Sequence, residues 1–293
     1  VKYLFLKNYL MFSKRRETQP IAELLVEIDK CDLPAGAENL SKPRGICVDD
    51  GMEIINSGQR VVALSGSGVG EIPDQVREIY DQTGVTKIKP HQRCGKAALV
   101  LKQRGNFEPS HEEVDEFART AAMVLAGQIG VEVGRTIGFD DRNTRLIRHP
   151  DHHPAGQAVM TLSGRLQHNL LPEDAKKLVP PHFNLEGTYV DDDYLRSVAV
   201  GEMRLVNQIA SGDHGIGILP QGFRFTALAD LDDPKLKQKL DGLKDTFELV
   251  RDSVDIERRE GKIINPVSLD AVGYKIGQGR SGLSVSFEPL KLD

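Results

Sequence analysis

The predicted fold of this chain is decided by the stretch RVVALSGSGVGEIPDQVREIYDQTGVTKI, residues 60–88. The stretch begins with an apolar run typical of a buried strand and continues into a glycine-rich turn. Apolar residues then recur at helical spacing over residues 72–83, and Gly84 stands where a helix C-cap is expected. Another apolar strand follows at residues 85–88. Strand, turn, helix and strand in this order predict a parallel βαβ crossover.

Similar elements are predicted on both sides of this crossover. Further strands are expected at residues 45–48, 158–162, 223–228 and 283–287, and helices at residues 97–103, 112–128, 195–210 and 235–258. Ser110 and Glu113 have the spacing of a capping box. We therefore expect one α/β domain over residues 41–293, centred on a parallel sheet with helices on both faces. Residues 1–40, with an amphipathic stretch at 21–28, are predicted to form an N-terminal arm or capping helix.

The composition is that of a soluble globular protein. The chain has 293 residues, of which 39% are hydrophobic and 28% charged. A net charge of -5 with mixed signs argues against nucleic acid or an anionic membrane as a partner, and the sequence has no apolar run of about 18 residues. Three cysteines cannot form a disulfide framework, which indicates a reducing compartment and a cytoplasmic location.

Three residues have the chemistry and placement of metal ligands. Cys47 ends the strand predicted at residues 45–48, and His91 and Cys94 follow the strand at residues 85–88. Ligands bind at the carboxyl ends of parallel strands, and a His and a Cys three residues apart can face one ion where a strand opens into a helix. Two thiolates and one imidazole suit zinc and leave a fourth position open. Alternatively, Cys47 is a small buried hydrophobic residue.

The patterns Cys47-x-Asp49 and His91-x-x-Cys94-Gly95 resemble the beta-class carbonic anhydrases, including zeta-class and uncharacterised bacterial relatives, over about residues 43–105. The resemblance implies one zinc ion per chain on Cys47, His91 and Cys94, with Asp49 beside it, and a homodimer. It also implies a lyase that reversibly hydrates carbon dioxide to bicarbonate by metal-bound hydroxide, or hydrolyses carbonyl sulfide or carbon disulfide. The family has an arginine where this chain has Gly51. Without it, Asp49 can close the site, and the alternative is a catalytically silent metal-binding or anion-binding protein.

The glycine-rich turn is expected to take part in the same chemistry. We expect Gly66, Ser67 and Gly68 to contact the substrate, because their backbone N–H groups can stabilise the developing bicarbonate charge. Two alternatives remain open. The turn can bind a nucleotide phosphate at a helix N-terminus, or it can simply allow close backbone packing.

Two other polar segments are candidates for function. Asp213 and His214 lie between glycines and are predicted to support the site or to transfer protons, although an ordinary helix end explains them as well. A second cluster contains His149, Asp151, His152 and His153. Its Asp-His-His-Pro string resembles the DHH phosphoesterases, which bind manganese, and makes a metal-dependent phosphoesterase the third functional hypothesis. A solvated loop is the alternative.

Overall fold

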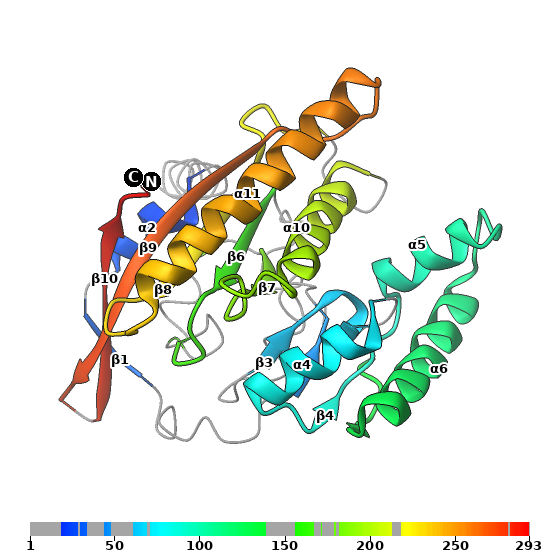
Figure 1. Ribbon diagram of the computed structural model, residues 1–293, viewed down its shortest axis with the longest axis horizontal. Helices are drawn as coiled ribbons and strands as arrows, with labels where there is room; N and C mark the ends of the chain where they lie inside the picture. Colours follow the sequence, from blue (N-terminus) through cyan, green and yellow to red (C-terminus); the bar gives the residue numbers. More distant parts are fainter. Residues whose placement is uncertain are drawn as a thin grey trace, which may run out of the picture.

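The computed structural model describes residues 19–28, 30–33, 44–47, 61–68, 71–138, 156–166, 171, 179, 182–212, 218–280 and 282–292. These residues form a mixed α/β fold with two mostly parallel sheets and associated helices, which confirms the predicted α/β class (Figure 1). Within the described part of the chain, no helix is long and apolar enough to cross a membrane.

Residues 44–138, called the N-terminal unit below, form a four-stranded sheet in which all neighbouring strands are parallel. The strand order is β3-β2-β4-β5. The strands are β2 (Arg44–Ile46), β3 (Val61–Ala63), β4 (Lys87–Ile88) and β5 (Glu132–Val133). The helices are η1 (Ser65–Gly68), α4 (Pro73–Thr83), α5 (Gly95–Gln103) and α6 (His111–Ile129).

The ends of α4 and α6 follow from local sequence. Glu113 N donates to Ser110 Oγ at 3.3 Å and Ser110 N donates to Glu113 Oε2 at 2.7 Å, which confirms the predicted capping box. Gly84 ends α4 with φ 75° and Gly130 ends α6 with φ 77°. Both values lie in the left-handed region, where glycine carries no Cβ penalty.

Residues 156–292, called the C-terminal unit below, build most of a six-stranded sheet of order β1-β10-β9-β8-β6-β7. Four of its strands, in the order β7-β6-β8-β9, are parallel, and β10 and β1 add antiparallel pairs. The strands are β6 (Gln157–Thr161), β7 (Phe183–Glu186), β8 (Phe223–Asp230), β9 (Val267–Gln278), β10 (Leu283–Leu290) and β1 (Cys31–Asp32). The helices are α10 (Arg196–Ser211) and α11 (Leu236–Arg259).

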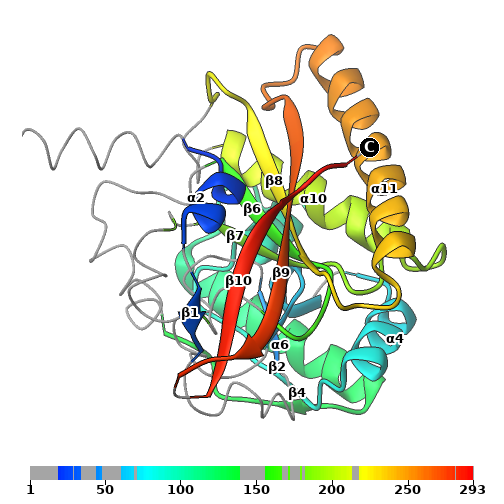
Figure 2. The ribbon, with the colours of Figure 1, turned by 90° about the vertical axis from the view of Figure 1, so that its left-hand side faces the viewer.

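The two units share one hydrophobic core. Buried side chains of β2 and β3, such as Ile46 and Val62, belong to the same cluster as Phe183 and Phe225 of the C-terminal sheet. Strands β3 and β7, each at the edge of its own sheet, lie in contact. A second cluster lies under helix α2 (Ile21–Glu27), which packs with β1 against β10 and β9 (Figure 2).

Strands β7 and β9 were not predicted from the sequence. Strand β9 contains Gly273 and Gly277, which weaken a strand considered alone, and Asp270 and Lys275, which interrupt its apolar character. In the structure β9 pairs with β8 on one side and β10 on the other. Pairing on both edges therefore outweighs the weak local preference.

Gly242 marks a tight contact between α11 and the turn that follows β7, at Val190 and Asp191. A Cβ at Gly242 would clash with the backbone carbonyl oxygen of Val190. Gly242→Ala is therefore expected to destabilise the fold by about 1–3 kcal/mol, measured by denaturant unfolding. Gly201→Ala in α10 is the matched control, because a Cβ there meets nothing within 4 Å and should stabilise the helix by up to about 1 kcal/mol. Equal effects of the two substitutions would contradict the prediction.

Candidate metal centre

Cys47, His91 and Cys94 come together in the N-terminal unit, and we call them the thiol–imidazole cluster. One ligand atom of each residue lies within 4.8 Å of the other two. The three residues are 4%, 1% and 2% exposed. The group can hold a metal ion, as the sequence pattern predicts.

The sheet explains why the three residues meet. Strands β2 and β4 are parallel neighbours, with Gly45 opposite Ile88. Cys47 directly follows β2, and the turn after β4 begins at His91, which bridges to Ile137. The carboxyl ends of the two strands therefore deliver their following residues to the same edge of the sheet. Gly45 is required here, because a Cβ would clash with the hydroxyl of buried Tyr80.

A left-handed residue brings His91 and Cys94 to the same side. Arg93 has φ 51°, the one non-glycine residue of the described chain with a positive φ. Its N–H donates to Asp115 Oδ1 of α6 at 2.5 Å, which holds the turn in a conformation that is costly for a residue with a Cβ. Asp115 therefore positions, from outside it, the turn that carries His91 and Cys94.

Asp115→Ala is expected to lower the metal affinity of the protein by about 10-fold or more, because loss of a hydrogen bond that orients ligands typically costs 10–100-fold. Competition of the variant with a zinc chelator measures the change. Glu112→Ala, which removes an exposed carboxylate from the same end of α6, is the control and should leave affinity unchanged. Unchanged metal affinity in Asp115→Ala would show that the turn keeps its conformation without the hydrogen bond to Asp115.

The hydrogen bond of His91 determines which ring nitrogen faces the cluster. Nδ1 lies 2.8 Å from the backbone carbonyl oxygen of Gln92. A carbonyl only accepts, so Nδ1 carries the proton and Nε2 carries the lone pair. A backbone carbonyl on the distal nitrogen is the usual support of a metal-binding histidine.

The glycine-rich turn contacts the cluster directly. Gly66 N donates to Cys47 Sγ at 3.2 Å, so this N–H group faces the thiol that was predicted to bind metal. Gly68 has φ 87°, and a Cβ there would press on Val76. Ser67 lies between them in η1. The structure thus places the predicted substrate-binding turn beside Cys47.

The two sulfur atoms interact. A hydrogen bond to Cys94, burial, and the charge of Cys94 raise the pKa of Cys47 well above its ordinary value, while His91 lowers it. A divalent cation would stabilise the thiolate form of Cys47 and thereby lower its pKa.

Buried Tyr80 of α4 and residues of the C-terminal unit lie around the cluster, and none of them was predicted as part of the site. Tyr80 is fully buried, and its pKa is raised by burial, by Glu202 of α10 and by Cys47. Tyr189 has a pKa raised by burial and by Glu202. A side chain at Gly95 would contact Ile209 of α10. Tyr189, Glu202 and Ile209 lie more than 90 positions after Cys94, so no local motif could connect them to the cluster.

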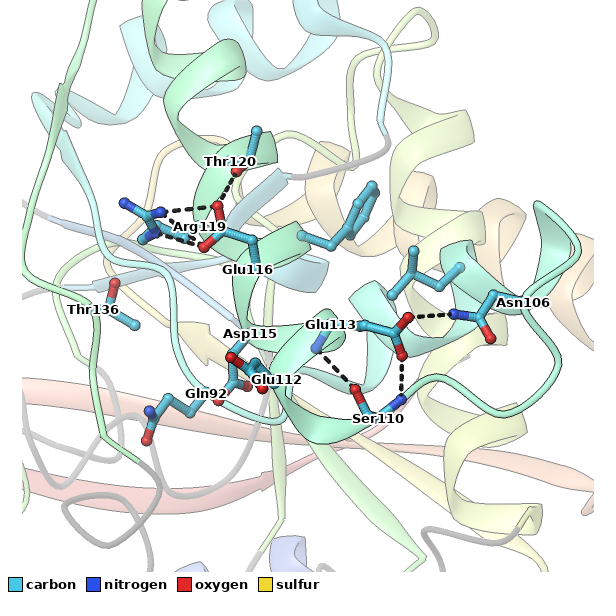
Figure 3. A pocket seen from close by; sticks show the side chains of 12 residues that line it. Gln92, Asn106, Ser110, Glu112, Glu113, Asp115, Glu116, Arg119, Thr120 and Thr136 are labelled. Carbon is cyan, nitrogen blue, oxygen red and sulfur yellow. Dashed lines mark hydrogen bonds and ion pairs between the residues drawn. The ribbon is translucent and has the colours of Figure 1, made fainter.

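An open groove lies beside the turn that carries His91 and Cys94 (Figure 3). Its volume is about 1100 Å³, and Gln92, Asp115 and Thr136 contribute to its wall together with the acidic face of α6. Several of these carboxylates already have partners: Glu116 pairs with Arg119 at 2.8 Å, and Glu113 caps α6. The groove therefore gives access to the outer side of the turn that carries His91 and Cys94.

Other predicted site residues lie outside the described residues. They are Asp49, Gly51, Asp213, His214 and the cluster His149, Asp151, His152 and His153.

The fold and the cluster define a mixed α/β protein with a buried cysteine–histidine–cysteine group that can hold a metal ion. No protein-family model and no curated protein matches this chain.

Proposed function

We propose that this protein is a zinc-dependent lyase of the beta-class carbonic anhydrase type, which interconverts carbon dioxide and bicarbonate. The observation that carries the proposal is the buried thiol–imidazole cluster at the ends of β2 and β4. Its position agrees with the resemblance of the two sequence patterns to that family.

The donor set fits zinc. A tetrahedral zinc ion with bonds of about 2.3 Å to sulfur and about 2.0–2.1 Å to nitrogen keeps its ligand atoms roughly 3.5–3.8 Å apart. The three ligand atoms here lie within 4.8 Å of one another, so small side-chain movements bring them to that spacing. The lone pair of His91 Nε2 and two sulfur ligands leave one position for a substrate or water. A zinc ion there would supply Lewis acidity and an activated water at neutral pH.

The residues of the chain have distinct roles in this proposal. Cys47, His91 and Cys94 hold the ion, and the Gly66 N–H lowers the negative charge on the Cys47 sulfur by hydrogen bonding. Asp49, two residues after Cys47, orients the reacting water. The deep burial of the ligands favours a small neutral substrate such as carbon dioxide over a phosphate ester.

A second candidate is a protein that binds the metal without catalysis. Gly51 favours it, because the arginine that holds the aspartate off the metal in the family is absent at this position. Asp49 would then occupy the fourth position and exclude the substrate.

The experiment that separates these candidates is zinc analysis of purified protein together with a carbon dioxide hydration assay. We expect about one zinc per chain in the wild type and in Cys31→Ser, whose sulfur lies in β1 away from the cluster, and none in Cys94→Ser. Activity that is lost with the zinc supports the lyase. Zinc without activity supports the closed site, and a wild-type chain that takes up no metal overturns both.

A further inference from the structure

The two units have the same strand order. In the N-terminal unit the four strands follow the chain as β2, β3, β4 and β5, and their spatial order is second, first, third, fourth. In the C-terminal unit the parallel strands follow the chain as β6, β7, β8 and β9, and their spatial order is again second, first, third, fourth. All eight strands are parallel to their neighbours within these two sets.

Backbone hydrogen bonds give the residue-by-residue equivalence of the first strands. Leu64 N donates to Ile46 O at 3.0 Å, and Gly187 N donates to Thr161 O at 2.9 Å, just beyond the second strand of each unit. Matching these bonds places Ile46 on Thr161. Cys47 then corresponds to Leu162.

The third strands are matched in the same way. Gln92 N donates to Ile137 O and Leu231 N donates to Tyr274 O, each at 3.0 Å. His91 therefore corresponds to Asp230. Counting two residues on from Gln92 and from Leu231 places Cys94 at Asp233.

The sheet registers agree with both matches. The pair Gly45 and Ile88 falls on the pair Met160 and Ala227. The bridge between His91 and Ile137 likewise falls on the pair Asp230 and Tyr274.

In the C-terminal unit, the positively charged side chains of Lys239 and Arg165 lie at the position matched to the cluster. Lys239 Nζ donates to Leu162 O at 2.8 Å and to Asp233 Oδ2 at 2.7 Å, and Lys239 is 9% exposed. Asp230, 1% exposed, accepts from Arg165 at 2.9 Å. Buried carboxylates need a cation nearby, and here two side chains of the same unit provide it. The C-terminal unit therefore places an ammonium group where the N-terminal unit gathers its soft ligands.

The units also meet as two copies of one protein would. Strand β3 is the second strand of its unit and β7 is the second strand of the other, and these two edges are in contact. The helices that follow them interact as well, because Gln75 Nε2 of α4 donates to Tyr194 O and Ser197 Oγ at 2.9 and 3.1 Å, the latter residue in α10. Contact between equivalent edges is the arrangement of an isologous dimer.

We propose that the chain is an internal pair of one α/β unit, in which the C-terminal copy of the metal position is occupied by the Lys239 ammonium group. The proposal uses the thiol–imidazole cluster as its reference and thus rests on the proposed function for the identity of the metal. One chain then carries one metal ion and has the second unit where a homodimer would have a second subunit.

The test restores the ligands at the matched positions. The full-length chain carrying Leu162→Cys, Asp230→His, Asp233→Cys and Lys239→Ala is purified with zinc chloride, and zinc per chain is compared with that of the wild type. We expect about one additional zinc per chain, and this second zinc should still be bound when Cys94→Ser removes the first. A folded variant with no increase, judged by circular dichroism, overturns the equivalence.

A second measurement applies even where the four substitutions prevent folding. The wild type is expected to be monomeric in sedimentation equilibrium with no more than one zinc per chain. A stable homodimer or two zinc ions per chain would overturn the internal pair. A wild type without zinc contradicts the proposed function but not the internal pair. The internal pair is tested by the zinc that the substituted chain binds in addition to the wild-type amount.

Discussion

His91→Ala is expected to reduce zinc affinity by more than about 100-fold and to abolish carbon dioxide hydration at limiting zinc. Loss of a residue that merely orients a ligand costs 10–100-fold, so loss of the ligand itself should cost more. The Nδ1 contact with Gln92 O leaves Nε2 as the donor atom, and alanine has none. Chelator competition gives the affinity, and stopped-flow hydration gives the activity.

His111→Ala is the control for this substitution. His111 is the first residue of α6 and is exposed, so its loss should change neither affinity nor activity. If the two variants bind zinc equally well, the ion is not held by the thiol–imidazole cluster.

Lys239→Met is expected to lower the free energy of unfolding by roughly 2–3 kcal/mol near neutral pH. The substitution keeps an unbranched side chain that is one atom shorter, and it removes the charged group that Asp233 and the carbonyl of Leu162 contact. Lys237→Met, at an exposed position of the same helix, should change stability by less than about 0.5 kcal/mol. Urea unfolding of the three proteins measures the difference.

The effect of Lys239→Met should depend on pH. Burial alone would raise the pKa of Asp233, but hydrogen bonds from Lys239 and the Lys235 amide, with both ammonium charges, lower it overall. A lowered pKa contributes stability above the unfolded value of about 3.9, and this contribution is lost as the pH falls through the folded pKa. The difference between wild type and variant should therefore shrink below about pH 4. A difference that stays constant down to pH 3 would assign the loss to packing.

Much of the N-terminal unit could be predicted because its signals are local. The capping box of α6 and the C-cap at Gly84 involve residues within one turn of each other. The three proposed ligands were likewise found from strand ends and a short His-x-x-Cys spacing. The hydrogen bond from Gly66 N to Cys47 Sγ was not predicted, because it depends on how two strands 19 residues apart are aligned.

The similarity of the two units could not be found from residue identity. At the matched positions Cys47 is replaced by a leucine and His91 by an aspartate. The side-chain chemistry therefore differs where the backbone hydrogen bonds agree. Strands β7 and β9 were also absent from the predicted elements, and the four-strand pattern of the C-terminal unit was therefore incomplete. The equivalence is visible only in the strand order, which is a property of tertiary pairing.

The start of helix α2 lies next to the end of β10, the last strand. Pro20 and Ala22 line one small cavity together with Leu290 and Leu292, so the first and last described segments are neighbours. A short linker could join them, and new ends could be opened in the connection from β5 to β6, which are the last described strand of one unit and the first of the other. The order of the units along the gene is thus separable from their arrangement in space, and a circularly permuted chain should reach the same fold.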